Sequence, residues 1–127
     1  MPAAKILVID DDAVARELLA DALKKDGHEV ESFSNGSDAL ARGQQATFDL
    51  VLTDVVMPEM SGVELAARIE ALQPGVPVLF MSGYPDEQLM QLGVDRHQIN
   101  FIAKPFAIDA LTAKLRAIRG TTRPDCA

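Results

Sequence analysis

Residues 47–58 read TFDLVLTDVVMP, and this stretch decides the fold. Its apolar run, Leu50-Val51-Leu52, predicts a strand that is buried on both faces, as the strands of parallel sheets are. The strand ends on a carboxylate, Asp54, and Met57-Pro58 then breaks the pattern. A charged side chain at the end of a buried strand is costly unless something pairs with it. We therefore expect the rest of the chain to supply partners for Asp54.

Apolar runs and helical periods alternate along the rest of the chain. Five strands that alternate with five helices predict an α/β fold, a doubly wound parallel sheet with helices on both faces. The alternation of polar and apolar residues at 28–33 places that strand near the sheet edge. Strands are predicted at residues 5–9, 28–33, 50–54, 76–81 and 99–103, and helices at residues 13–25, 37–45, 61–73, 85–92 and 108–119.

Three of the predicted helices carry an apolar stripe, which is expected to face the core. Gly120 is expected to end the last helix, so that residues 1–120 form one domain and residues 121–127 form a flexible tail. His28 and His97 lie far from the carboxyl ends of the strands, and both are expected at the surface. The stripes consist of Val14, Leu18, Leu19, Ala22 and Leu23; of Val63, Leu65, Ala66, Ile69 and Leu72; and of Ile108, Leu111, Leu115 and Ile118.

Polar side chains collect where the predicted strands end. Asp10 and Asp11 follow the first strand, Asp54 ends the third, Ser82 follows the fourth and Lys104 follows the fifth. Because the carboxyl ends of parallel strands meet at one edge of the sheet, we expect these side chains to lie together.

This set of side chains supports phosphoryl transfer to an aspartate. Crowded carboxylates repel one another, and a hard divalent cation such as Mg²⁺ relieves the repulsion because it prefers oxygen ligands. The Lys104 ammonium and the Ser82 hydroxyl would stabilise the equatorial oxygens of a phosphoryl group during transfer. A carboxylate can act as the nucleophile and form an acyl phosphate.

The chain resembles the receiver domain of two-component response regulators from residue 5 to about residue 119. The resemblance implies a flavodoxin-like (βα)5 fold with strand order 2-1-3-4-5. It also implies signal transduction in a phosphorelay, with a histidine kinase or a histidine phosphotransfer domain as the phosphodonor. The motifs that carry it are Asp10-Asp11, Asp54 to Pro58 followed by Gly62, Ser82-Gly83, and Lys104-Pro105-Phe106.

The resemblance implies that Asp54 is the phosphoacceptor and that the cofactor is Mg²⁺, with Mn²⁺ as an alternative ion. Asp11, Asp54 and the backbone carbonyl of Val56 would bind the ion directly, and Asp10 would hold it through water. The chain would catalyse its own phosphorylation and slow dephosphorylation without being an enzyme acting on a separate substrate.

The resemblance also implies a switch. Ser82 and Lys104 would each bind a phosphoryl oxygen, and the bond before Pro105 would be cis. After phosphorylation Ser82 would move toward the phosphoryl group, and Phe101 would turn into the space that it leaves. That movement repacks the face formed by the fourth helix, the fifth strand and the fifth helix, where a downstream protein would bind. The chain would be a monomer or a phosphorylation-dependent dimer.

Two positions are expected to set the lifetime of the acyl phosphate. In the family, the residues two beyond the phosphoacceptor and two beyond the Ser or Thr influence hydrolysis, and here they are Val56 and Tyr84. Neither side chain offers an amide or a carboxylate that would position a water molecule. We therefore expect slow self-dephosphorylation.

The composition narrows the range of partners. The chain has 127 residues with a net charge of −7, no Trp and one Tyr, so direct binding to nucleic acid is not expected. The only cysteine, Cys126, rules out an internal disulfide. The sequence shows neither a signal peptide nor a run long enough to span a membrane, so we expect a cytoplasmic location without direct membrane contact.

Two other functions fit parts of the pattern. Asp10 and Asp12 match the opening motif of phosphatases of the haloacid dehalogenase type, although the chain is short for that fold and lacks the later acidic motif; helix capping is sufficient to explain Asp12. A pseudo-receiver would keep the fold and use it only for binding. The chain is expected to be either a stand-alone regulator or part of a hybrid histidine kinase, whose receivers the run from Phe80 to Pro85 resembles.

Overall fold

The computed structural model describes residues 3–95 and 99–121. The strands form one parallel sheet in the order β2-β1-β3-β4-β5, which confirms the predicted doubly wound fold and its strand order. The strands are β1 (Lys5–Ile9), β2 (Glu29–Phe33), β3 (Leu50–Asp54), β4 (Val78–Ser82) and β5 (Phe101–Ala103). The helices are α1 (Ala13–Lys25), α2 (Gly36–Gly43), α3 (Gly62–Leu72), α4 (Asp86–Gln91) and α5 (Ile108–Thr121).

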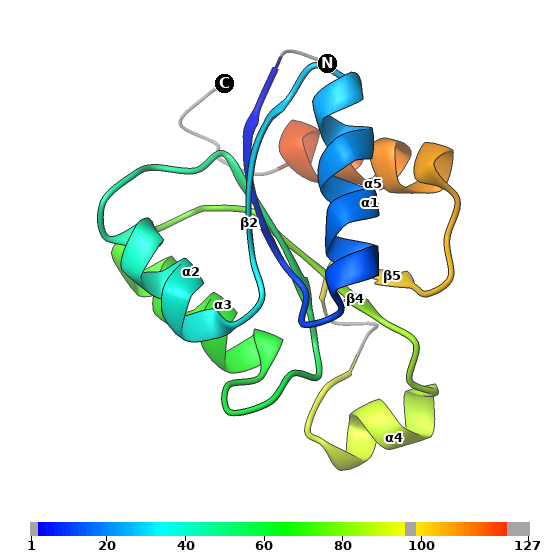
Figure 1. Cartoon of the computed structure of the whole chain (residues 1–127). Coiled ribbons are helices and arrows are strands. Elements are labelled where there is room, and N and C mark those ends of the chain that lie inside the picture. The colour runs from blue at the N-terminus through cyan, green and yellow to red at the C-terminus, as the bar shows by residue number, and fades with distance from the viewer. Residues whose placement is uncertain (1–2, 96–98, 122–127) are drawn as a thin grey trace.

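Helices cover both faces of the sheet (Figure 1). α1 and α5 lie on one face, α2 and α3 lie on the other, and α4 lies near the carboxyl ends of the strands. Side chains of β1 alternate between the two cores: Ile6 and Val8 pack under α1 and α5, whereas Leu7 and Ile9 pack under α2 and α3. The central strands are thus buried on both faces, as their continuous apolar runs predicted.

Asp12 and Ser61 cap α1 and α3, and the cap at Asp12 confirms the role expected from the sequence. Asp12 Oδ1 accepts hydrogen bonds from the backbone amides of Val14 and Ala15, and Ser61 Oγ accepts one from the Glu64 amide. Both caps lie in the short connections that follow β1 and β3. They allow each helix to begin soon after a strand, so the strand-end carboxylates remain at the sheet edge.

The apolar stripes were only partly correct. In α1, Leu19 and Leu23 are buried, but Val14 and Leu18 are 67% and 64% exposed. Helical periodicity shows which residues share a side of a helix, but it does not show how wide a strip of that side touches the sheet. The other stripe residues that the structure places at the surface are Val63, Leu72 and Ile108.

His28 is buried, and its predicted place at the surface was wrong. Its Nδ1 accepts a hydrogen bond from the Ala4 amide at 3.0 Å, and its Nε2 lies 3.3 Å from Asp26 Oδ2. The His28 ring thus connects the start of β1 with the turn after α1. Local sequence does not reveal this contact, because the two residues are 24 positions apart. His97 lies outside the described residues.

Several element boundaries differ from the prediction. α5 continues through Gly120 to Thr121, so Gly120 does not end it, and residues 122–127 of the predicted tail lie outside the described residues. Asn35 caps α2, which therefore begins at Gly36, one residue earlier than expected. In the described part of the chain, no helix is long and apolar enough to cross a bilayer.

Candidate functional site

The ends of β1, β3, β4 and β5 meet around a polar cavity of about 330 Å³. Six of the site residues predicted from the sequence contribute to its wall, although they come from four separate strand ends. This is the arrangement expected where the strands of an open α/β sheet end. The lining residues are Asp10, Asp12, Asp54, Val56, Ser82, Gly83, Tyr84 and Lys104.

Asp10 is fully buried, and hydrogen bonds hold both of its carboxylate oxygens. Oδ1 accepts from the Asp12 amide at 3.0 Å, and Oδ2 accepts from Lys104 Nζ at 2.8 Å. Its backbone amide donates to the carbonyl of Phe33 on β2 at 3.2 Å. Buried polar atoms need such partners, and these hydrogen bonds hold the Asp10 side chain in place at the cavity wall.

Lys104 connects two of the carboxylates. Its Nζ lies 2.8 Å from Asp10 Oδ2 and 3.4 Å from Asp54 Oδ2. Burial by itself lowers the pKa of this ammonium, but the hydrogen bond to Asp10 and the charges of Asp54 and Asp10 outweigh burial, so the pKa of Lys104 is raised. The lysine therefore keeps its positive charge inside the cavity.

Burial raises the pKa of the Asp54 carboxyl to about 6. The Lys104 ammonium opposes this shift, whereas the charges of Asp10 and Asp11 add to it. Only 14% of the Asp54 side chain is exposed, so water compensates little of the cost of ionising it. A further cation in the cavity would therefore stabilise the charged form of Asp54.

Asp54 is expected to lower the stability of the cation-free protein as the pH rises from about 4 to about 6. In the unfolded chain the Asp54 carboxyl has its ordinary pKa of 3.8, so it has already lost its proton in this interval. In the folded protein the same carboxyl still keeps its proton. The difference between 3.8 and about 6 corresponds to roughly 3 kcal/mol of unfolding free energy. Urea unfolding of the wild-type protein and Asp54→Asn, with a chelator present, measures the effect.

The stability advantage of Asp54→Asn should grow as the pH rises through this interval and stay constant above about pH 6. Carboxyl groups far from the cavity contribute alike in both proteins, so the difference between the two reports on Asp54 and on the neighbouring charges to which it is coupled. An advantage that did not change with pH would contradict the raised pKa.

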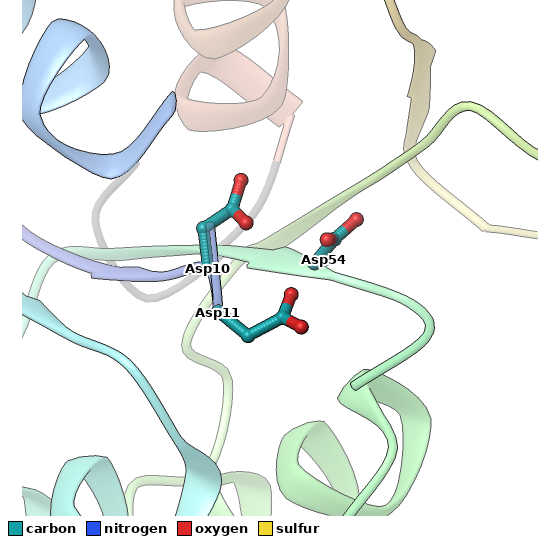
Figure 2. Close-up of side chains that lie close together, drawn as sticks. All are labelled: Asp10, Asp11 and Asp54. Atoms are coloured by element: carbon teal, nitrogen blue, oxygen red, sulfur yellow. The ribbon is translucent and has the colours of Figure 1, made fainter. Parts of the chain in front are cut away.

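Asp11 completes a group of three carboxylates (Figure 2). One oxygen each from Asp10, Asp11 and Asp54 lies within 4.8 Å of the others. Asp11 is exposed, and among residues 3–95 and 99–121 no hydrogen bond or ion pair engages its carboxylate. A hard cation binds carboxylate oxygens and keeps several of its own waters. Such an ion could contact Asp11 and Asp54 directly and reach Asp10 through one of those waters. The residues present therefore fit Mg²⁺ or Mn²⁺.

Ser82 is buried at the end of β4, and its hydroxyl lies in the cavity wall. Oγ accepts a hydrogen bond from the Tyr84 amide at 3.0 Å, which leaves the hydroxyl proton free for an acceptor. The Ser82 carbonyl accepts from the Lys104 amide at 2.8 Å, so the two phosphoryl-binding candidates are linked through the backbone. The Tyr84 side chain itself is 44% exposed.

Phe101 does not line the cavity. It is buried at the start of β5 beside Phe80 of β4 and belongs to a small core that includes Leu89 of α4. The Lys104–Pro105 bond, which follows the other end of β5, is cis, the conformation that the resemblance implied. Phe101 and the cavity thus lie at opposite ends of one three-residue strand.

Arg16 contacts the site but was not identified from the sequence, and the close approach of Gly62 to Asp54 was not foreseen. Arg16 Nη1 donates to the carbonyl oxygen of Asp10 at 2.9 Å. A cation in the first turns of a helix opposes the helix dipole, so the position of Arg16 early in α1 was an available signal. Gly62 belongs to the family motif, but the sequence does not show that its Cα lies against the Asp54 carbonyl with no room for a Cβ.

Known proteins share this sequence pattern. The sequence model of the response regulator receiver domain matches residues 6–116. The response regulator receiver protein CpdR of Brucella abortus is 36% identical over 111 residues, which are 87% of this chain and 92% of CpdR. The response regulator MprA of Mycobacterium leprae is 31% identical over 95% of this chain, which spans 53% of MprA. The chain thus spans about half the length of several curated relatives that it matches.

Solved structures agree with the sequence comparison. The chemotaxis protein CheY4 of Vibrio cholerae superposes with a TM-score of 0.79 at 30% identity, covering 92% of this chain and 99% of CheY4. The receiver domain of the hybrid histidine kinase CckA superposes with a TM-score of 0.76 at 27% identity, covering 91% of this chain and 98% of that domain.

The phosphatase alternative loses its main support, because Asp12 caps α1. The chain belongs to the response regulator receiver domain family.

Proposed function

We propose that this chain carries a phosphoryl group in a two-component phosphorelay, and that it accepts the group on Asp54 from a histidine kinase or a histidine phosphotransfer protein in the cytoplasm. The observation that carries the proposal is the position of Asp54. Its carboxylate lies in a polar cavity within reach of the Lys104 ammonium, the Ser82 hydroxyl and two further carboxylates. The relatives support the general role, since CpdR and MprA are response regulators.

Mg²⁺, or Mn²⁺ in its place, would bind where the three carboxylates converge. The Asp11 carboxylate and Asp54 Oδ1 would contact the ion directly, and the carbonyl of Val56, a residue of the cavity wall, would be a third ligand. Asp10 would act through water because hydrogen bonds engage its own oxygens. When bound, the ion supplies positive charge that offsets the negative charge of the phosphoryl oxygens. Its charge would also favour the ionised form of Asp54.

Asp54 would be the nucleophile. A carboxylate oxygen of Asp54 forms the new P–O bond while the P–N bond to the donor imidazole breaks, and the imidazole nitrogen keeps the electron pair. Lys104 Nζ, 3.4 Å from Asp54 Oδ2, would pair with one phosphoryl oxygen, and the Ser82 hydroxyl would donate to another. The proposed transfer is supported by the presence of all three side chains in the wall of one cavity.

Phosphorylation would shift the chain between two states. Ser82 would move toward the phosphoryl group, and Phe101 would turn into the vacated space, which would repack the surface of α4, β5 and α5 for a downstream protein. Met90 and Leu92 are each 58% exposed at the end of α4 and support an apolar contact there. The chain would be a monomer or a phosphorylation-dependent dimer, as a stand-alone regulator or as part of a hybrid kinase.

Incubation with acetyl phosphate tests this function. Intact-mass measurement should show one added phosphoryl group per chain with Mg²⁺ and none with a chelator. A phosphorylated histidine phosphotransfer protein should serve as a second donor. If neither donor transfers its group, the chain is a binding module that keeps only the fold; steady turnover of a phosphate ester would instead indicate a phosphatase.

The acyl phosphate is expected to persist, because Val56 and the exposed Tyr84 offer no group that would orient an attacking water. Val56→Asn places an amide at the cavity wall and should shorten the lifetime by about tenfold, less than the ~10²-fold or more that a full general base supplies. The measurement follows loss of the label after the donor is removed, with Mg²⁺ present. A wild-type half-life of only seconds would contradict the assignment of slow hydrolysis.

A further inference from the structure

Arg16 lies beside the carboxylates but pairs with none of their side chains in the described part of the chain. It sits one turn into α1, where its amide donates to the Asp12 carbonyl at 2.9 Å, and its side chain is half-buried. The guanidinium reaches back toward the sheet, and Nη1 donates to the Asp10 carbonyl oxygen at 2.9 Å. The mechanism of phosphoryl transfer assigns this cation no role.

The carbonyl that Arg16 holds lies at the point where β1 leaves the sheet. The Asp10 amide still bonds to Phe33 of β2, but no backbone donor within residues 3–95 and 99–121 reaches the Asp10 carbonyl. A buried carbonyl needs a partner, and the Arg16 guanidinium provides a charged one. The direction of this carbonyl therefore depends on the Arg16 side chain.

The same carbonyl belongs to the peptide unit that joins Asp10 to Asp11. This unit is planar, so fixing its oxygen also fixes the direction in which the chain enters Asp11. No protein group restrains the Asp11 carboxylate among the described residues, in contrast to Asp10, whose two oxygens are both bonded. The backbone alone thus directs Asp11 toward Asp54 (Figure 2).

We propose that Arg16 is a positioning residue for the cation site: its hydrogen bond to the Asp10 carbonyl orients the Asp10–Asp11 peptide and so places the Asp11 carboxylate within the group of three. This inference rests on the proposed function, in which that group binds Mg²⁺. Residues that orient metal ligands typically change the affinity by 10-fold to 100-fold when they are replaced. Arg16→Met should therefore weaken Mg²⁺ binding by roughly tenfold.

A role of Arg16 through charge alone would have the opposite effect. The guanidinium repels a divalent cation, so removing its charge without disturbing Asp11 would strengthen Mg²⁺ binding or leave it unchanged. Arg16→Lys separates the two effects further. The lysine side chain keeps the positive charge, but its ammonium nitrogen lies one bond closer to the backbone than Nη1 does. It also lacks the planar set of N–H donors of the guanidinium. Positioning predicts weaker binding for Arg16→Lys, whereas a charge effect predicts no change.

Isothermal titration of Mg²⁺ into the unphosphorylated chain of 127 residues measures the affinities of the wild type and the two Arg16 variants. Lys24→Met is the matched control, since it removes one positive charge from the last turn of the same helix. Thermal unfolding without Mg²⁺ shows whether each variant is folded at the titration temperature. If Arg16→Met is not folded, the comparison of Arg16→Lys with the wild type decides the question.

Weaker binding by both Arg16 variants, with Lys24→Met like the wild type, supports the positioning role. An affinity of the folded Arg16 variants equal to or higher than that of the wild type overturns it and leaves the proposed function intact. Failure of the wild-type protein to bind Mg²⁺ would instead contradict the proposed function, and the positioning role with it. At saturating Mg²⁺, the rate of phosphate uptake from acetyl phosphate should recover in Arg16→Met, because Asp54 and Lys104 are unchanged.

Discussion

Asp54→Asn is expected to take up no phosphoryl group from acetyl phosphate or from a phosphorylated histidine. An amide nitrogen or oxygen cannot form the stable acyl phosphate that a carboxylate forms, so the loss should be complete rather than partial. The variant should still fold, because the change removes a buried charge whose ionisation is unfavourable, as the raised pKa of Asp54 shows. Intact-mass measurement after incubation with donor and Mg²⁺ detects the loss.

Asp12→Asn is the matched control for this experiment. Asp12 lines the same cavity, and the control makes the same chemical change. Asn caps helices about as well as Asp does, so α1 should keep its N-terminal hydrogen bonds and phosphate uptake should persist. Uptake that survived in Asp54→Asn would contradict the assignment of Asp54 as the phosphoacceptor, and a label found at Asp10 in that variant would favour the phosphatase alternative.

Among the described glycines whose φ is not positive, Gly62 is the one at which substitution by Ala is expected to lower the free energy of unfolding most. A Cβ on residue 62 would overlap the backbone carbonyl of Asp54 and press on Thr53 Oγ1 at 3.2 Å. The Gly62 amide donates to the Val55 carbonyl at 2.8 Å, so α3 cannot move away without breaking a hydrogen bond. Overpacking against backbone should cost about 3 kcal/mol or more of unfolding free energy.

Urea unfolding in the presence of a chelator measures this loss without a contribution from bound cation. Gly43→Ala is the control: Gly43 is also a buried helical glycine, but its added Cβ would meet only side-chain atoms at 3.8 and 3.9 Å. That substitution should be neutral or stabilise the protein by up to about 1 kcal/mol, since Ala favours a helix more than Gly does. Equal effects of the two substitutions would contradict close packing of α3 against Asp54. Gly62→Ala should also impair phosphate uptake, because the overlapping atoms belong to the phosphoacceptor itself.

The sheet and its strand-end residues could be predicted because their signals are local. Each central strand is a short apolar run that ends in a polar residue, and parallel topology then brings those ends to one edge. Asp10, Asp54, Ser82 and Lys104 consequently meet in the cavity as expected. The caps at Asp12 and Ser61 are also local, since each uses a side-chain oxygen and an amide two or three residues ahead.

The errors arose where packing between distant segments decides the outcome. Helical periodicity grouped Leu18 with Leu19, but the sheet covers only one of them. His28 is polar by sequence, yet a backbone amide 24 residues away gives it a partner inside the fold. The contact of Arg16 with Asp10 and the close approach of Gly62 to Asp54 depend on where α1 and α3 lie against the strand ends. None of these follows from spacing along the chain.

Mapping the phosphorylated residue in the wild-type protein tests the central claim most directly. The protein is incubated with acetyl phosphate and Mg²⁺, the acyl phosphate is reduced with borohydride, and the peptides are analysed by mass spectrometry. The proposed function predicts that the modified side chain is Asp54 alone and that no modification forms when a chelator replaces Mg²⁺. Modification at Asp10, at a histidine, or at no residue would contradict it.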